Sequence, residues 1–268
     1  DDLFKDQDGY FDALVGVYSI MASENLYGKN MTMGFMDALV QNYYITSAAH
    51  PFYYASKYDY THNASQTIID KFWEKMYEAV VNTNNVLTRL EKASKSMFSD
   101  DNYNLIKGEA LALRAFIHLD LLRLFAPAPV VADQKKYIPY MEDYGTLFGD
   151  RESVKDCMNK IIRDLKQAKK LLSEVDIIPE NRIWSKTYYR IEGGRGVVDD
   201  NLPRDIFYMY RGYRMNYWAT TAILARAYMY TVNKRLHGNK LKKLLKPRMK
   251  KMEGPITVFL LLLPEIMA

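Results

Sequence analysis

The sequence predicts a mostly all-α protein in which helices pack in pairs and long irregular loops join them. Apolar residues recur at three- and four-residue steps in five long segments, and no segment alternates with period two for long. Small and aromatic side chains interleave on these segments, which is typical of a helical repeat of the tetratricopeptide kind. Three long connections, residues 22–65, 126–150 and 173–212, interrupt the repeat. Any strands should be short.

The first two predicted helices each carry one apolar stripe that would face a neighbouring helix. They span about residues 7–21 and 66–93. The stripe of the first consists of Tyr10, Leu14, Val17 and Met21. The stripe of the second consists of Ile69, Phe72, Trp73, Met76, Val80, Asn84 and Leu87.

The third helix, residues 105–125, is apolar on almost every side, so it should lie between other helices. The residues before it, Ser99, Asp100 and Asp101, offer N-cap chemistry. Two prolines shortly after it end the helix, because proline lacks an N–H and disfavours helical backbone in the residue before it. We expect Glu109, Arg114 and the pair of Asp120 and Arg123 to connect helices rather than bind a ligand. We expect His118 to be a structural histidine with a hydrogen-bond partner.

The fourth and fifth helices are predicted over about residues 152–172 and 213–230. The fourth carries the only cysteine, Cys157, next to its apolar stripe, which indicates a packed core position rather than a reactive thiol. The fifth contains small residues at helical spacing, which allow close helix approach. A single cysteine also excludes an intrachain disulfide and a cysteine-based zinc site.

Composition excludes several classes of protein. The net charge is +5, but residues 234–268 hold nine Lys and Arg against two Asp and Glu, a local charge of +7 that leaves −2 for residues 1–233. A body of that charge is not a nucleic-acid-binding surface. No apolar run reaches the roughly 18 residues of a membrane-spanning helix. The four histidines show no metal-ligand spacing and no phosphate-binding loop occurs, so we expect no metal, no cofactor and no catalysis.

Several motifs together resemble one family. The opening "GYFDALVGVYSIM", the later "FWEKMYEAVVNTNNVL" and above all "KGEALALRAFIHLDLLRLFAPAPVV" are similar to the helices of SusD/RagB-like proteins. "RESVKDCMNKIIRDLKQAKKLL" and "RMNYWATTAILARAYMY" follow in the order the family has them. These motifs cover residues 9–230. Members are commonly about twice as long, so the chain resembles the N-terminal part only, and Ala126 stands where the family often has Gly.

The resemblance implies a tetratricopeptide-like scaffold and a non-catalytic function in nutrient uptake. Such proteins are cell-surface lipoproteins of the Bacteroidetes outer membrane that bind glycans. They work with a TonB-dependent, SusC-like transporter. By resemblance, this chain would bind an oligosaccharide or similar nutrient, and its lipid anchor would precede Asp1, giving the only link to the membrane.

An aromatic loop, defined as residues 42–63, is the candidate ligand-binding segment. Flat aromatic rings bind the apolar C–H faces of sugars, and neighbouring amides and carboxylates bind the hydroxyls. In the resembled family the corresponding connection contributes to the glycan platform. The candidate residues are Tyr43, Tyr44, Tyr53, Tyr54, Tyr58, Tyr60, Asn42, Asp59 and Asn63. The alternative is that these tyrosines pack the loop onto the helices.

The domain boundary is expected at residue 233, where a SusD-like helical domain (1–233) gives way to an atypical basic tail (234–268). One interpretation of the tail is a one-base frameshift near Asn233, because the shifted codons can encode an amphipathic helix that a glycine ends. The other is a natural basic amphipathic terminus that contacts a membrane or a partner. Two further alternatives concern function: a tetratricopeptide-type adaptor that binds a peptide, and a truncated fragment that binds nothing.

Overall fold

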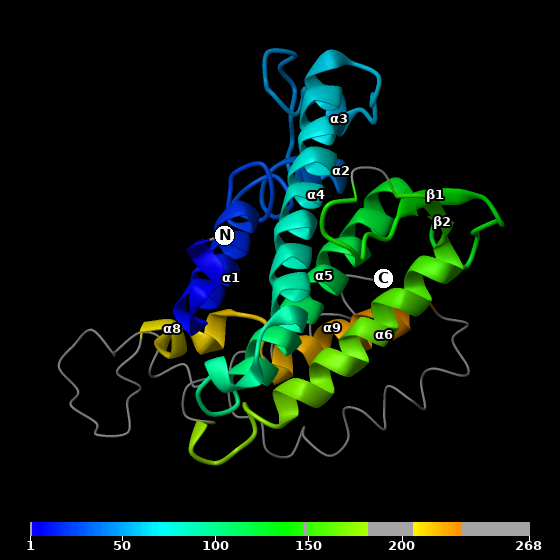
Figure 1. Ribbon diagram of the computed structural model, residues 1–268. Coiled ribbons are helices and arrows are strands. Elements are labelled where there is room, and N and C mark those ends of the chain that lie inside the picture. The colour runs from blue at the N-terminus through cyan, green and yellow to red at the C-terminus, as the bar shows by residue number, and fades with distance from the viewer. Residues whose placement is uncertain (1, 147–148, 182–205, 232–268) are drawn as a thin grey trace. The chain divides into compact units, whose positions relative to one another are not determined.

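The computed structural model describes residues 2–146, 149–181 and 206–231 (Figure 1). This part of the chain is mostly helical, which confirms the predicted class. The chain divides into two compact units, Asp1–Met97 with Met141–Phe148, and Phe98–Tyr140 with Gly149–Ala268. The basic tail, residues 234–268, lies outside the described residues, so both interpretations of it remain predictions.

Two long helices form the scaffold of the first unit, and α1 (Gln7–Met21) packs on α4 (Asn63–Lys92). Most residues of their apolar stripes are buried as predicted, and Leu14 and Val17 on α1 and Met76 and Val80 on α4 are fully inaccessible to solvent. Ile69 and Trp73 of the α4 stripe are half-buried. The 3-10 turn η1 (Asp2–Lys5) precedes α1, and η2 (Lys95–Met97) follows α4.

Two short helices, α2 (Phe35–Leu39) and α3 (Tyr53–Ser56), lie in the connection between α1 and α4. The sequence predicts an irregular loop over this connection. Helices of five and four residues are too short to show an apolar period, so periodicity could not reveal them. The two pack on each other, and Phe35 contacts both Phe52 and Phe72 edge to face.

Three helices form the scaffold of the second unit: α5 (Asn102–Phe125), α6 (Val154–Ser173) and α9 (Tyr217–Tyr230). α6 packs along α5 and also contacts α9, and Figure 1 shows the three side by side. Seventeen residues of α5 are buried, spread around its whole circumference, which confirms that it is packed on more than one face. It ends at Phe125, before the two prolines, as predicted.

One expectation about α5 is wrong. Asp101 is its N-cap residue, but the side chain makes no capping hydrogen bond. An N-cap side chain reaches the first helical N–H groups from extended backbone, whereas Asp101 has φ −93° and ψ 20°. The preceding Asp100 adopts a left-handed conformation, φ 48°, which places the chain in a tight turn there.

A small antiparallel sheet leads into α6. Strand β1 (Lys136–Pro139) pairs with β2 (Arg151–Ser153), with Ile138 opposite Glu152. Ser153 ends the strand and caps the helix, since its Oγ accepts a hydrogen bond from Asp156 N–H at 3.2 Å. The predicted helix began at about Glu152, which the structure places in β2.

The segment before α9 contains α8 (Ile206–Met209) and the 3-10 turn η4 (Arg211–Tyr213). The sequence predicts that this helix begins at about Tyr213, but α9 begins at Tyr217. Asn216 decides this boundary, because its side chain accepts a hydrogen bond from Ala219 N–H at 2.9 Å and so caps the helix.

Candidate functional site

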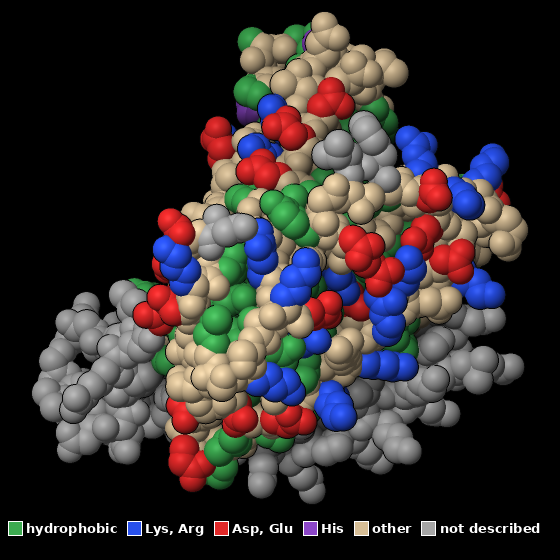
Figure 2. Space-filling model, viewed as in Figure 1, with side chains coloured by type: hydrophobic (Ala, Val, Ile, Leu, Met, Phe, Trp, Pro, Cys, Tyr) green, Lys and Arg blue, Asp and Glu red, His purple; other side chains and the backbone are tan. Residues whose placement is uncertain are grey.

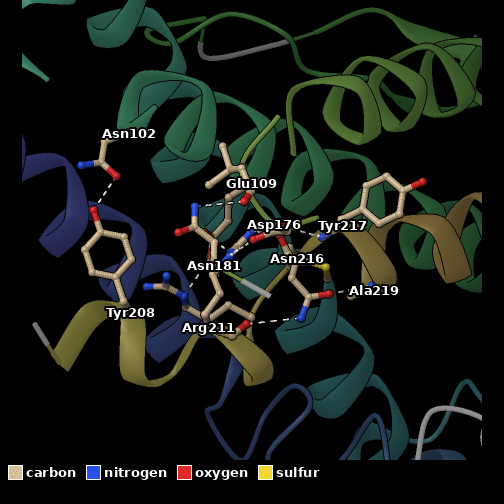
Figure 3. A network of polar contacts seen from close by, with 12 residues as sticks. Asn102, Glu109, Asp176, Asn181, Tyr208, Arg211, Asn216, Tyr217 and Ala219 are labelled. Atoms are coloured by element: carbon tan, nitrogen blue, oxygen red, sulfur yellow. Dashed lines mark hydrogen bonds and ion pairs between the residues drawn. The ribbon is translucent and has the colours of Figure 1, made fainter. Parts of the chain in front are cut away.

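The most deeply buried polar cluster holds the second unit together (Figure 3). Arg211, with no exposed surface, donates from Nη1 to Glu109 Oε2 at 2.7 Å, and from Nε and Nη2 to the two oxygens of Asp176 at 2.8 Å each. Asp176 Oδ2 also accepts from the Tyr217 N–H at 2.7 Å. Arg214 Nε lies 3.2 Å from Glu109 Oε1, so two cations balance two anions. This cluster is structural, as predicted for Glu109.

A second buried cluster joins α5 to α6. Arg114 and Tyr140 both donate to Asp164 Oδ2 at 2.7 Å, which confirms that Arg114 connects helices. Burial raises the pKa of Tyr140 well above its ordinary value. His118 is fully buried, with Nδ1 2.8 Å from the Arg114 carbonyl oxygen and its ring stacked on Tyr140 at 4.0 Å. It is a structural histidine with a hydrogen-bond partner, as expected.

Asp120 forms a third, half-exposed ion cluster. Its Oδ1 lies 2.8 Å from Arg123 Nη1 on the same helix and 2.9 Å from Arg226 Nη2 on α9. Asp120 therefore joins α5 to α9 through Arg226, as predicted, whereas its contact with Arg123 lies within α5. Like the two buried clusters, it is explained by packing within the unit.

The aromatic loop differs from these clusters because four of its tyrosine rings are exposed. Tyr44 is 96% exposed, Tyr58 55%, Tyr60 47% and Tyr43 39%. Tyr53 and Tyr54, on α3, are half-buried. Exposed aromatic rings are costly in water and mark contact surfaces when they gather in one segment. Among the described residues, no ring contact joins Tyr43 or Tyr44 to Tyr58 or Tyr60.

The first part of the loop folds back over α2. Asn42 Nδ2 donates to Asp37 Oδ1 at 3.2 Å, and the Tyr43 hydroxyl donates to the Met33 carbonyl. Both contacts are local, and neither involves the exposed ring of Tyr44. Gln41, just before them, has a left-handed backbone with φ 62°.

The second part of the loop leads into α4. Tyr58 is left-handed, with φ 59°, a conformation that costs a non-glycine residue about 1–2 kcal/mol. Asp59 Oδ1 accepts hydrogen bonds from the Thr61 hydroxyl at 2.8 Å and from the Thr61 and His62 N–H groups at 3.1 Å each. The Thr61 hydroxyl bond lowers the pKa of Asp59, so the side chain is a carboxylate at neutral pH.

The rings of Tyr54 and His62 pack on each other at the start of α4. Their rings stack at 3.3 Å with an interplanar angle of 6°, while His62 Nδ1 accepts from the Ala64 N–H at 3.2 Å and caps the helix. Tyr53 meets Tyr54 edge to face at 5.2 Å. Asn63 is the first residue of α4 rather than part of the loop, and its side chain is exposed there.

The described part of the chain contains neither a candidate metal site nor a membrane-spanning helix. No group of three or more His, Cys, Asp and Glu residues there could hold a metal ion. None of the helices described is long and apolar enough to cross a membrane. On the face of the described residues seen in Figure 2, Lys and Arg side chains lie among Asp and Glu side chains rather than in a basic stripe.

Comparison with known proteins identifies the family. Residues 11–186, more than half of the chain, match the SusD-like family described as "Starch-binding associating with outer membrane". The chain belongs to the SusD-like family. Among curated proteins, no sequence matches it.

Solved structures of SusD superfamily proteins share the fold. One from Bacteroides thetaiotaomicron is 18% identical with a TM-score of 0.63, over 92% of this chain and 46% of that one. One from Bacteroides vulgatus is 19% identical with a TM-score of 0.62, over 91% and 48%. A SusD-like carbohydrate binding protein, also from Bacteroides vulgatus, is 17% identical with a TM-score of 0.62, over 92% and 45%. The chain thus spans about half the length of these SusD-like proteins.

Proposed function

We propose that this SusD-like chain is a non-catalytic carbohydrate-binding protein whose aromatic loop stacks on sugar rings. The observation that carries the proposal is the exposure of Tyr44, 96% of whose surface is open to water. Packing of the loop onto the scaffold does not require that ring. A bound sugar would cover the ring of Tyr44 and remove its apolar surface from water.

Polar groups beside the rings support a ligand rich in hydroxyls. The carboxylate of Asp59 accepts three hydrogen bonds on Oδ1 alone, and a carboxylate has acceptor capacity on both oxygens. Asn42 carries a carbonyl acceptor beside Tyr43. Fixed acceptors next to flat apolar rings match the alternation of C–H faces and hydroxyl edges on a sugar.

Family membership supports the cellular setting of the proposal. Related proteins are described as starch-binding and as associating with the outer membrane. We propose the same place for this chain: a lipid-anchored protein on the cell surface that passes an oligosaccharide to a TonB-dependent transporter. No catalytic step is needed for that function.

A glycan array on the purified chain tests the proposal. The expected result is retention of oligosaccharides whose sugars have stackable faces, with the bound glycan recovered at its original length when it is analysed by chromatography. Cleavage of the glycan would contradict a non-catalytic function. Retention of peptides but not glycans would favour the adaptor alternative, and retention of neither would favour an inactive fragment.

A further inference from the structure

The four exposed tyrosines of the aromatic loop form two pairs along the sequence. The first pair, Tyr43 and Tyr44, follows the left-handed Gln41 at the end of α2. The second pair, Tyr58 and Tyr60, begins with the left-handed Tyr58 at the end of α3. Each pair therefore starts from a sharp turn at the C-terminal end of a short helix.

One side chain connects the two turns. Gln41 Nε2 donates to the carbonyl oxygen of Ser56, the last residue of α3, at 2.8 Å. The same nitrogen lies 3.4 Å from the carbonyl oxygen of Ala38 in α2. Ser56 is 5% exposed, so its carbonyl belongs to a position with little access to water. Gln41 thus joins the C-terminal ends of α2 and α3, 15 residues apart in the sequence.

A separate contact fixes the opposite ends of the two helices. Phe35, the first residue of α2, meets Phe52, the N-cap residue of α3, edge to face at 6.3 Å. Phe35 also packs on Phe72 of α4 at 5.5 Å. Loss of the Gln41 contact would therefore leave the helices packed at one end and remove the hydrogen bond that joins their other ends, which carry the tyrosines.

We propose that Gln41 is a positioning residue that fixes the separation of the two tyrosine pairs, and that the ligand is an oligosaccharide long enough to contact both. The second half of this inference rests on the proposed carbohydrate-binding function. Two pairs held at a fixed separation gain affinity for a chain that spans them, because the second contact is then intramolecular. A short sugar that reaches one pair gains nothing from the connection.

The variant Gln41→Asn isolates this connection. Asparagine tolerates the left-handed backbone at least as well as glutamine, so the turn is kept. Its side chain is one methylene shorter, so the amide no longer reaches Ser56. Gln134→Asn, at an exposed glutamine before β1 in the second unit, is the matched control.

Hydrogen exchange measured without any ligand tests the positioning role. We expect backbone amides of residues 57–61 to exchange about fivefold faster in Gln41→Asn than in the wild type, while Gln134→Asn exchanges as the wild type does. Unchanged exchange at residues 57–61 in Gln41→Asn would overturn the positioning role, whatever the ligand.

Calorimetric titration with maltotriose and maltoheptaose tests the ligand length. We expect the wild type to bind maltoheptaose more tightly, and Gln41→Asn to lose about tenfold in affinity for maltoheptaose with maltotriose affinity unchanged. Equal losses for both sugars would contradict a ligand that spans the pairs. A wild type that binds neither sugar would overturn the oligosaccharide claim and count against the proposed function, while the exchange result would still decide the role of Gln41.

Discussion

The thiol of Cys157 lies in a fully buried position, with Sγ 3.8 Å from the Ile138 carbonyl oxygen. Burial raises the pKa of this thiol to about 12 from an ordinary value of 9.0, because the apolar surroundings disfavour the thiolate. The thiolate is the form that attacks electrophiles. Cys157 is therefore a packing residue, which agrees with its place beside the apolar stripe of α6.

This burial predicts slow alkylation. Native protein at pH 8 should resist iodoacetamide, because only about one thiol in ten thousand is ionised at four pH units below its pKa. The urea-unfolded chain should react within minutes. Mass spectrometry measures the extent of alkylation in both cases. The raised pKa also favours the folded state below pH 9 and loses that contribution as pH rises toward 12. Rapid labelling of the folded protein would show that the thiol is accessible.

The tyrosines show what can be predicted at the level of one residue. Their abundance in residues 42–63 is visible in the sequence, and the structure does expose Tyr43, Tyr44, Tyr58 and Tyr60. Tyr53 and Tyr54 are half-buried because they lie on α3, a helix too short to give an apolar period. The contact from Gln41 to Ser56 was also missed, since a side-chain bond to a backbone carbonyl 15 residues away leaves no pattern in the sequence.

Helix packing in the second unit depends on Gly108. A Cβ at this position would lie 2.8 Å from Leu172 Cγ and 3.2 Å from Leu171 Cβ, closer than carbon atoms pack. The glycine therefore permits the close approach of α5 and α6. Gly16 in α1 offers a contrast, because a Cβ there would have nothing within 4 Å.

Alanine at these two glycines should have opposite effects. Gly108→Ala should lower the free energy of unfolding by about 1–3 kcal/mol, because the added methyl overpacks the interface between α5 and α6. Gly16→Ala should raise it by about 0.5–1 kcal/mol, because alanine favours an exposed helical position. Urea denaturation followed by circular dichroism measures both. Stabilisation by Gly108→Ala would contradict the close approach of the two helices.

Long helices were predictable because each repeats its apolar pattern over several turns. The bounds of α1 matched those predicted, Gln7–Met21, and α5 ended where the prolines required. The starts of α6 and α9 differed by a few residues, because local caps at Ser153 and Asn216 set them. The buried contacts from Arg211 to Asp176 and Glu109 could not be predicted, since they join segments 35 and 102 residues apart.

At the scale of the whole molecule, the buried ion clusters and the proposed binding segment lie in different units. The buried ion clusters around Arg114 and Arg211 lie in the second unit, where they hold helices together. The aromatic loop lies entirely in the first unit, and the two short helices of this connection pack on each other and on α4. The chain spans about half the length of the SusD-like structures it matches.

The most direct test of the central claim is calorimetric titration of the wild type and Tyr44→Ala with maltoheptaose. We expect Tyr44→Ala to weaken binding by at least about tenfold, since it removes a stacking surface, with the free energy of unfolding changed by less than about 0.5 kcal/mol. Tyr210→Ala, at an exposed tyrosine of the second unit, should bind as the wild type does. Wild-type affinity in Tyr44→Ala would contradict recognition by the aromatic loop.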